Sequence, residues 1–429
     1  MARRIMILGV GFVLAAGMLY YYTCVLVPIW QKQSLIKDAA PGNWSDLYPR
    51  WLGAQELLWR HRNPYSPEIT REIQRGFYGR PLNPSNPHDP TDPEAFVYPV
   101  YVAFLLAPFL RLPFDAVRAV YAEAMWCLTL VSIPLWMRAL RVSFSPTATI
   151  LACLGIMSSY AAIDGFHLEQ LTLLVAFLMA GSMAALVRGR LVLAGVLLAL
   201  TTIKPQLVVL VVAFLLLWTL SDWRPRKWFA LGFGGVMAAF LIGAEVVLPG
   251  WFGFWRRAAR EYVYFHRPSL LANMLGKHAG LAVGAVGIVF CGIVFWRARK
   301  EPAGSERFNF AWVSALVMTE LIVPNAGGGA FYNQLLLAPA GLWLFTSGRA
   351  LAREKAWVRF TWWAAVVMLA SQWVLASCVS FIVFALHHHF ASDAELVAGF
   401  PALVVYEFPL VLALFLLSAA LRSSRLETA

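Results

Sequence analysis

The chain has 429 residues, of which 60% are hydrophobic and only 14% are charged, and its formal net charge is +12. A mean hydropathy of +0.65 excludes a water-soluble domain of this length. The basic residues fall in small groups between apolar runs, as in cytoplasmic loops, so nucleic acid is not an expected partner. The composition therefore predicts an all-α, polytopic membrane protein.

The first apolar run, Ile5 to Trp30, follows Arg3 and Arg4 and is long enough to cross a bilayer. A cleavable signal peptide has a shorter apolar core and a small-residue cleavage site. We therefore expect this run to remain in the chain as a signal anchor, with the N-terminus in the cytoplasm.

Residues 31–113 are predicted to form a long outer loop with interfacial or re-entrant helices. Near its start, Asp46 follows the turn-forming residues 41–43 and precedes Tyr48 and Trp51, which is typical of the beginning of an interfacial helix. A carboxylate at this position suits a general base, and it equally suits a helix cap. Both interpretations of Asp46 stay open.

The later apolar runs bring the expected total to about twelve helices, which form one membrane domain over residues 1–429. They lie near 115–137, 146–163, 168–187, 191–203, 206–220, 228–248, 279–296, 308–323, 334–347, 357–385 and 400–420. Alternation from a cytoplasmic N-terminus places the connecting basic groups and both termini inside. The segment Ala95–Pro113 is expected to be re-entrant or interfacial, because a crossing there would move Arg138, Arg141, Arg188 and Arg190 outside.

Lys204 stands between two apolar runs that are each short for a membrane span, which predicts a broken helix pair opening on the outer side. A lysine there costs roughly 2.5 kcal/mol or more unless it meets an anion or water, so it indicates a functional site. Snorkelling to the outer surface is the alternative. An amine at such a break suits a lipid phosphate.

Two further outer elements carry candidate binding residues. His167, Glu169 and Gln170 precede a helix, where side chains and free amides suit a sugar or phosphate, while capping by Asp164 is the competing interpretation. In the loop from Pro249 to His278, basic residues alternate with aromatic ones, which predicts an interfacial helix on anionic membrane lipids. The candidate binding residues of this loop are Arg256, Arg260 and His266.

Other signals are weaker. The five cysteines stand singly in or beside apolar runs, and the tract His387–His389 has no carboxylate or cysteine at ligand spacing, so no metal site is expected. The run Gly327–Gly329 lacks a following lysine and is interpreted as a hinge. The acidic residues Glu123, Glu245 and Glu320 leave a second class open, a transporter or flippase of a lipid-linked sugar.

The order of several short motifs resembles glycosyltransferase family 87, whose members are polyprenyl-phosphate-sugar-dependent enzymes of the GT-C superfamily, including alpha-mannosyltransferases. The likeness is strongest from residue 43 to 210. The motifs are Ser45-Asp46-Leu47-Tyr48, Trp59 to Tyr65, Phe96-Val97-Tyr98-Pro99, Leu105-Leu106-Ala107-Pro108, His167-Leu168-Glu169-Gln170, and Ala194-Gly195 through Lys204-Pro205.

The resemblance implies a GT-C-like bundle in the plasma (inner) membrane, with Asp46 as the base and an active site on the extracytoplasmic side. It implies a polyprenyl-phosphate sugar donor, held at its phosphate by basic residues such as Lys204, and a lipid or glycan acceptor. No metal or other cofactor is expected. The remaining sugar and headgroup contacts are expected from Tyr65, Tyr98, Gln170, Tyr332 and Asn333.

The chain departs from the family pattern in one place. Family members often carry a Trp and one or two His after the Pro of a late outer loop, whereas the stretch from Pro324 to Gln334 has no His. Tyr332 or Asn333 replaces it, or the substrate differs, or the chain is an inactive structural member. These three interpretations stay open.

Overall fold

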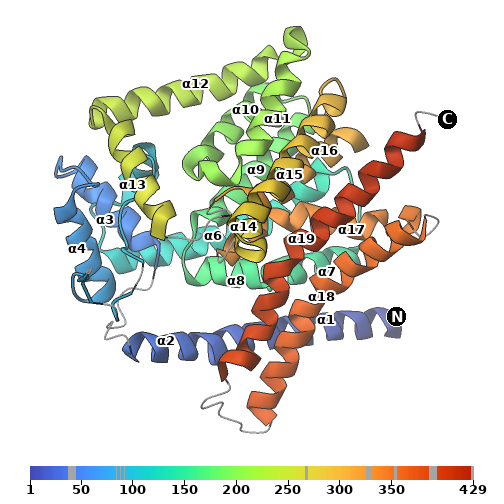
Figure 1. The fold of residues 1–429 in the computed structure, drawn as a ribbon, viewed down its shortest axis with the longest axis horizontal. Coiled ribbons are helices and arrows are strands. Elements are labelled where there is room, and N and C mark those ends of the chain that lie inside the picture. Colours follow the sequence, from blue (N-terminus) through green and yellow to red (C-terminus); the bar gives the residue numbers. More distant parts are fainter. Residues whose placement is uncertain are drawn as a thin grey trace.

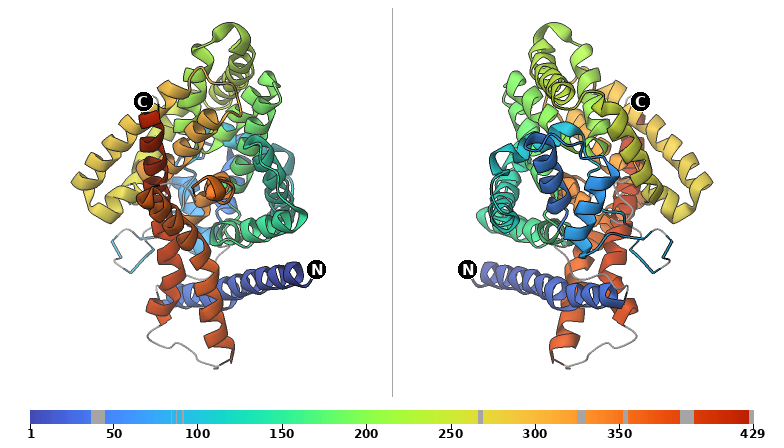
Figure 2. Two further views of the ribbon diagram at one scale, coloured as in Figure 1. Left: turned by 90° about the vertical axis from the view of Figure 1, so that its right-hand side faces the viewer. Right: turned by 90° about the vertical axis from the view of Figure 1, so that its left-hand side faces the viewer.

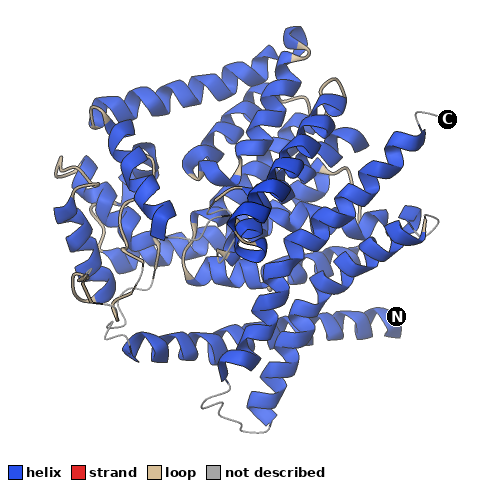
Figure 3. Cartoon of the chain, in the orientation of Figure 1, coloured by secondary structure: helices blue, strands red, loops and turns tan. Residues whose placement is uncertain are grey.

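The computed structural model describes residues 1–36, 45–83, 85–86, 88–90, 92–265, 269–324, 330–351, 355–385 and 394–426. Within these ranges the regular elements are all helices and none is a strand (Figure 3). The predicted all-α class is therefore confirmed. The predicted residue His266, the turn before Asp46, the glycine run and the histidine tract lie outside the described residues.

The first helix extends beyond the predicted anchor at both ends. α1 (Ala2–Tyr20) continues through a π-helical turn, Tyr21–Leu26, into α2 (Val27–Ile36). Single π-helical turns of this kind occur frequently at functional sites. Here the turn buries Tyr21 and Tyr22 against the rest of the protein.

Two helices, α3 (Leu47–Leu58) and the amphipathic α4 (Pro67–Tyr78), occupy the long polar region after α2. Local sequence explains both ends of α4. The Ser66 hydroxyl accepts a hydrogen bond from the Ile69 amide, proline occupies the first helical position, and Gly79 ends the helix with φ of 78°.

The segment after this region forms no long helix. It consists of a 3-10 turn (Val100–Val102), α5 (Ala103–Leu106) and a second 3-10 turn (Ala107–Phe109). Ten residues of such structure extend about 15 to 20 Å, against about 30 Å of bilayer hydrocarbon, so this segment is too short to cross as a helix. The buried Tyr101 donates a hydrogen bond to the Thr202 carbonyl (3.0 Å), which ties the segment to the break at Lys204.

The remaining helices follow in chain order. They are α6 (Phe114–Ala139), α7 (Pro146–Met157), α8 (Tyr160–His167), α9 (Leu171–Val187), α10 (Leu191–Leu200), α11 (Val209–Leu220), α12 (Trp223–Val247), α13 (Trp251–Phe265), α14 (Leu270–Leu275), α15 (Lys277–Ala298), α16 (Glu306–Ile322), α17 (Ala338–Leu351), α18 (Ala356–Ala385) and α19 (Ala394–Leu426).

Six helices in the described residues are long and apolar enough to cross a membrane, where the sequence predicted about twelve. They cover Ala2–Lys32, Phe114–Ala139, Trp223–Val247, Lys277–Ala298, Ala356–Ala385 and Val404–Leu421. A seventh span results if α7 and α8, bent by 49°, are one unit. The runs near 168–187, 191–203 and 206–220 form shorter apolar helices, so their membrane crossing stays a prediction.

The polar helices and the chain termini lie at opposite ends of the molecule. Figure 1 shows α3, α4 and α13 gathered at one end, with the N- and C-termini at the other. The continuous α1–α2 helix and α12 run along opposite edges between these ends (Figures 1 and 2). The short helices α8 to α11 lie between them.

Close helix contact fixes α10 beside α12. A Cβ atom added at Gly195 or at Gly232 would meet the backbone of the facing helix well inside the 3.0 Å that real Cβ atoms keep. The two helices therefore need glycine at both positions. This contact fixes the position of α10 relative to α12, and with it the position of the chain that leads to Lys204.

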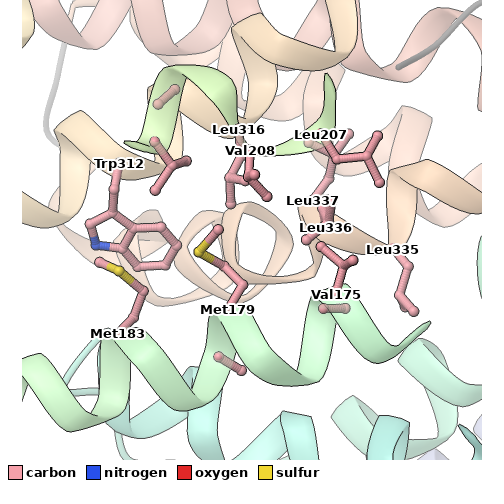
Figure 4. Close-up of a cluster of buried hydrophobic side chains, with 14 of the residues drawn as sticks. Val175, Met179, Met183, Leu207, Val208, Trp312, Leu316, Leu335, Leu336 and Leu337 are labelled. Atoms are coloured by element: carbon pink, nitrogen blue, oxygen red, sulfur yellow. The ribbon is translucent and has the colours of Figure 1, made fainter. Parts of the chain in front are cut away.

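A cluster of buried apolar side chains packs beside the break at Lys204 (Figure 4). Figure 4 shows Val175 and Met179 of α9, Leu207 and Val208 after the break, and Leu316 of α16 pointing toward one another. All five are buried. Apolar packing at interior density leaves little freedom to the backbone that carries Lys204.

Candidate active site

Asp46 precedes α3, and its carboxylate faces away from that helix. Its backbone amide donates to the Leu168 carbonyl (3.2 Å), which pins the start of α3 to the corner after α8. The side chain makes no capping hydrogen bond. Its Oδ2 accepts a hydrogen bond from Gln170 Nε2 instead, and the residue remains partly exposed. In this structure the carboxylate is therefore oriented by Gln170, and the capping alternative does not describe its contacts.

Gln170 links Asp46 to Lys204. The Gln170 side chain is fully buried, and its Oε1 accepts from Lys204 Nζ at 3.0 Å. The same amine donates to Thr172 Oγ1 (2.9 Å) and Asn333 Oδ1 (3.2 Å), and it lies 4.6 Å from the centre of the Tyr332 ring. The predicted base and the predicted amine thus belong to one hydrogen-bonded network.

The network also fixes the orientation of the Gln170 amide. An ammonium group has three donors and no acceptor, and the three acceptors around Lys204 occupy all of them. Because Lys204 requires the Gln170 oxygen on its side, the amide nitrogen must face Asp46. Lys204 therefore orients the donor that holds the carboxylate.

Backbone breaks place these side chains. The helix after α10 passes through a 3-10 turn and stops at Lys204, whose φ and ψ of −130° and 72° are not helical. Pro205 follows, and proline disfavours helical backbone in the residue before it. Gln170 has extended backbone at the start of α9 and makes no side-chain cap there. Both side chains are thus free to point into the protein rather than along their own helices.

Arg50, which the sequence analysis did not select, is the second buried cation of the site. It is only 1% exposed. Its Nε donates to the Asp46 carbonyl (2.7 Å) and its Nη2 to the Glu169 carbonyl (2.5 Å). Its guanidinium lies over the rings of Tyr98 and Tyr121, at 5.5 and 5.8 Å from their centres. A basic residue one helical turn after Asp46 was the signal available in the sequence.

Glu169 connects three segments of the site. Its carboxylate accepts hydrogen bonds from the Ser45 hydroxyl and from Arg118 Nε, and its backbone has a φ of 53°. A positive φ is uncommon outside glycine and marks a constrained corner. Because both oxygens are engaged, Glu169 orders the site rather than offering a free acid.

Two more acidic residues lie near Asp46: Asp92 influences the ionisation of Asp46, and Asp46 influences that of Glu94. Burial raises the pKa of Asp46, and Asp92 adds to this, while Arg50, Lys204 and the Gln170 hydrogen bond oppose the change. Burial, with Asp92 and Asp46, raises the pKa of Glu94 well above its ordinary value. Neither acid stood in a motif, so the sequence analysis missed both.

The remaining predicted residues lie around this network in different ways. The Tyr65 hydroxyl donates a hydrogen bond to the Tyr98 carbonyl (2.5 Å). The centre of the His167 ring lies 5.6 Å from the centre of the Tyr22 ring. Arg256 and Arg260 are exposed on α13.

α13 reaches the site through a different residue. Burial, followed by Tyr332 and Asp92, raises the pKa of Tyr262 well above its ordinary value, and Tyr98 and Asp46 add to the effect. Tyr262 is therefore close enough to these groups to interact with them electrostatically.

The three glutamates of the transporter alternative share no common path in the described residues. Glu123 is exposed on α6. Glu245 is also exposed, and its Oε1 accepts from the Gly250 amide (2.8 Å), which is a local contact at the end of α12. Only Glu320 is buried. The structure therefore gives the transporter alternative no support.

Comparison with known proteins gives one positive result. The model of glycosyltransferase family 87 matches residues 96–324, which is more than half of the chain. Searches of curated proteins and of solved structures found no match. The matched range contains Gln170 and Lys204. Asp46 lies 50 residues before its start and Asn333 lies 9 residues after its end, and both join it through the hydrogen bonds described above. The chain belongs to glycosyltransferase family 87.

Proposed function

We propose that the protein is an integral-membrane transferase that moves a mannose-like hexose or a pentose from a polyprenyl-phosphate donor to a lipid or glycan acceptor. Family membership supports glycosyl transfer, and the motif resemblance supports the lipid-linked donor. The observation that carries the proposal is Asp46, a partly exposed residue whose carboxylate is held by a buried amide that a buried lysine orients. Such an arrangement presents a general base in a fixed direction.

In the proposed reaction, the acceptor hydroxyl attacks the anomeric carbon of the donor sugar. The new carbon–oxygen bond forms as the bond from that carbon to the phosphate oxygen breaks, and Asp46 takes the hydroxyl proton. The phosphate changes from a diester with one negative charge to a monoester approaching two. A fixed cation near it therefore stabilises the transition state more than the bound donor.

Buried cations supply that field. Lys204 is 5% exposed and Arg50 is 1% exposed, so solvent screens neither strongly. Preorganised charges in such an environment are worth far more than in water. Lys204 thus contributes twice, through its charge and through the orientation of Gln170.

We place the reaction at the outer face of the plasma membrane, with both termini in the cytoplasm. The distribution of basic loops supports this orientation. The separation of α3, α4 and α13 from both termini in Figure 1 is consistent with it. Exposed Arg256 and Arg260 on α13 then meet anionic lipid headgroups beside the site.

The direct test compares Asp46→Asn with the wild type. Purified protein is supplied with polyprenyl-phosphate mannose and lipid acceptors, and glycolipid product is measured. Loss of a general base lowers the rate by about 10²- to 10⁴-fold. Asp115→Asn, which changes an exposed acid at the start of α6, is the matched control and retains full activity. Equal transfer by wild type and Asp46→Asn would remove Asp46 from the mechanism, and no transfer by wild type with any donor would favour an inactive family member.

A further inference from the structure

A small apolar groove adjoins the polar site at Arg50. It lies between α3, the segment 100–109, α6 and the start of α9, and its volume is about 160 Å³. Its lining is almost wholly apolar and includes Leu105, Phe109, Val120, Ala124 and Leu174. Val120 and Ala124 are exposed on α6, so the groove reaches the outside of the helix bundle.

The only charged residue that lines this groove is Arg50, and Tyr121 is its neighbour there. The Nη1 of Arg50 and the hydroxyl of Tyr121 are both buried and adjacent to each other, and neither makes a hydrogen bond of good geometry in the described part of the chain. A buried polar atom without a partner costs about 1–3 kcal/mol, and more when it is charged. Two such donors at one place are therefore expected to serve a ligand.

Lys204 differs from Arg50 in this respect. Its three donors are all occupied by Gln170, Thr172 and Asn333. A phosphate oxygen would have to displace one of these acceptors. Arg50 has a donor available without any rearrangement, and a guanidinium suits phosphate better than a compact ammonium does.

We propose that Arg50 Nη1 and the Tyr121 hydroxyl hold the phosphate of the lipid-linked donor, and that the first carbons of its isoprenoid chain lie in the groove. This inference rests on the proposed function and reassigns the direct phosphate contact from Lys204 to Arg50. A water molecule takes up about 30 Å³ in the liquid. A groove of about 160 Å³ therefore accepts the beginning of one isoprenoid chain and not a whole lipid tail. The rest of the chain then leaves past Val120 and Ala124 into the surrounding lipid.

The other bonds of Arg50 give this assignment a mechanistic consequence. Its Nε and Nη2 hold the backbone carbonyls of Asp46 and Glu169. One rigid side chain thus connects the proposed phosphate site with the backbone of the base. A sugar bridging the phosphate and Asp46 is consequently held with little freedom, which is the main contribution of a positioning group to rate.

A binding experiment separates Arg50 from Lys204. Polyprenyl phosphate and the uncharged polyprenol of equal length are each titrated into the purified full-length protein in nanodiscs. We expect wild type and Lys204→Gln to prefer the phosphate by about tenfold or more, which is about 1.4 kcal/mol. We expect Arg50→Gln to bind the two lipids alike. Loss of the preference in Lys204→Gln with its retention in Arg50→Gln would overturn the proposal.

A matched pair on α6 tests the groove. Ala124→Trp fills the groove from its exposed rim, and we expect it to weaken polyprenyl phosphate binding by about tenfold or more. Ala122→Trp makes the same change at an exposed position of the same helix that does not line the groove, and it binds as wild type does. Equal binding by the two variants places the chain elsewhere and contradicts the proposal.

Arg50→Gln also removes two backbone hydrogen bonds, so it is checked for folding by thermal unfolding and gel filtration. If it does not fold, Tyr121→Phe, which deletes only the hydroxyl, is expected to reduce the phosphate preference. An unchanged preference in that variant would then decide against the site. Sugar-transfer assays distinguish a failure of the proposed function from a failure of this inference. Transfer only from a water-soluble nucleotide sugar contradicts the proposed donor itself, whereas full activity of the folded Arg50 and Ala124 variants with the lipid donor contradicts this inference alone.

Discussion

Asp46 illustrates how far a single residue is predictable. Its position after a turn and before an aromatic pair indicated a base or a cap with equal weight. The deciding contact comes from Gln170, more than a hundred residues away, whose amide turns the carboxylate from α3. Local sequence thus selected Asp46 as a candidate, and only tertiary structure shows how its carboxylate is oriented.

In the proposed mechanism, the ionisation of Asp46 sets the acid limb of the activity profile. Burial is the largest influence and raises the pKa of Asp46. A protonated carboxyl group cannot accept the acceptor's proton, so activity is present above this pKa and is lost as pH falls through it. We expect kcat/KM to begin falling above the ordinary aspartate value of about 3.9. A pH–rate profile measures this, and a limb at or below that value would contradict it.

Lys204 offers a test that a purely structural residue would not pass. Its charge lowers the pKa of Asp46, against the effect of burial. Lys204→Gln should therefore move the acid limb to higher pH, and it should lower kcat by about tenfold or more because Gln170 is no longer oriented. Lys227→Gln, at an exposed position on α12, is the control and shifts neither. A reduced kcat with an unmoved acid limb would assign Lys204 to folding alone.

The residues missed by sequence reasoning share one property. Arg50, Thr172 and Glu94 belong to no motif, and each enters the site through a neighbour distant in the chain. Arg50 resembled any basic residue on an interfacial helix. Its burial, its unpartnered nitrogen and the adjoining groove became visible only once α3 was packed on α6 and α9.

At the scale of elements, helix breaks were more predictable than helix lengths. Lys-Pro within an apolar run indicated the interruption at Lys204, and the structure has it there. Hydropathy alone does not distinguish a spanning helix from a short buried one. Apolar runs such as 191–203 form helices shorter than a bilayer requires, so the predicted total is larger than the six long helices found in the described residues.

The contact between α10 and α12 gives a stability test on one helix. Gly232 lies against the backbone at Val192, so Gly232→Ala forces the helices apart and lowers the melting temperature. At Gly235 nothing lies within 4 Å of an added Cβ, so Gly235→Ala adds helix propensity of about 0.8–1.0 kcal/mol and raises it. Differential scanning fluorimetry in detergent compares the two. A common sign for both changes would refute the packing argument.

For the whole molecule, the membrane orientation is the property to test. His88, between α4 and the segment 100–109, and Arg188, after α9, are both exposed. In a variant lacking the five native cysteines, His88→Cys should react with a membrane-impermeant maleimide in intact cells. Arg188→Cys should react only after permeabilisation. The reverse pattern would place the site on the cytoplasmic side.

The first helix carries a further consequence. Within its π-helical turn, the Tyr22 hydroxyl donates to the buried Asp164 carboxylate (2.7 Å), and the backbone of Tyr332 hydrogen-bonds the same acid. The first helix, which the sequence predicts to be the membrane anchor, thereby shares the Asp164 carboxylate with Tyr332. Exchange of this anchor for a foreign hydrophobic helix of equal length would leave Asp164 without its phenol partner, so membrane insertion alone would not restore an intact enzyme.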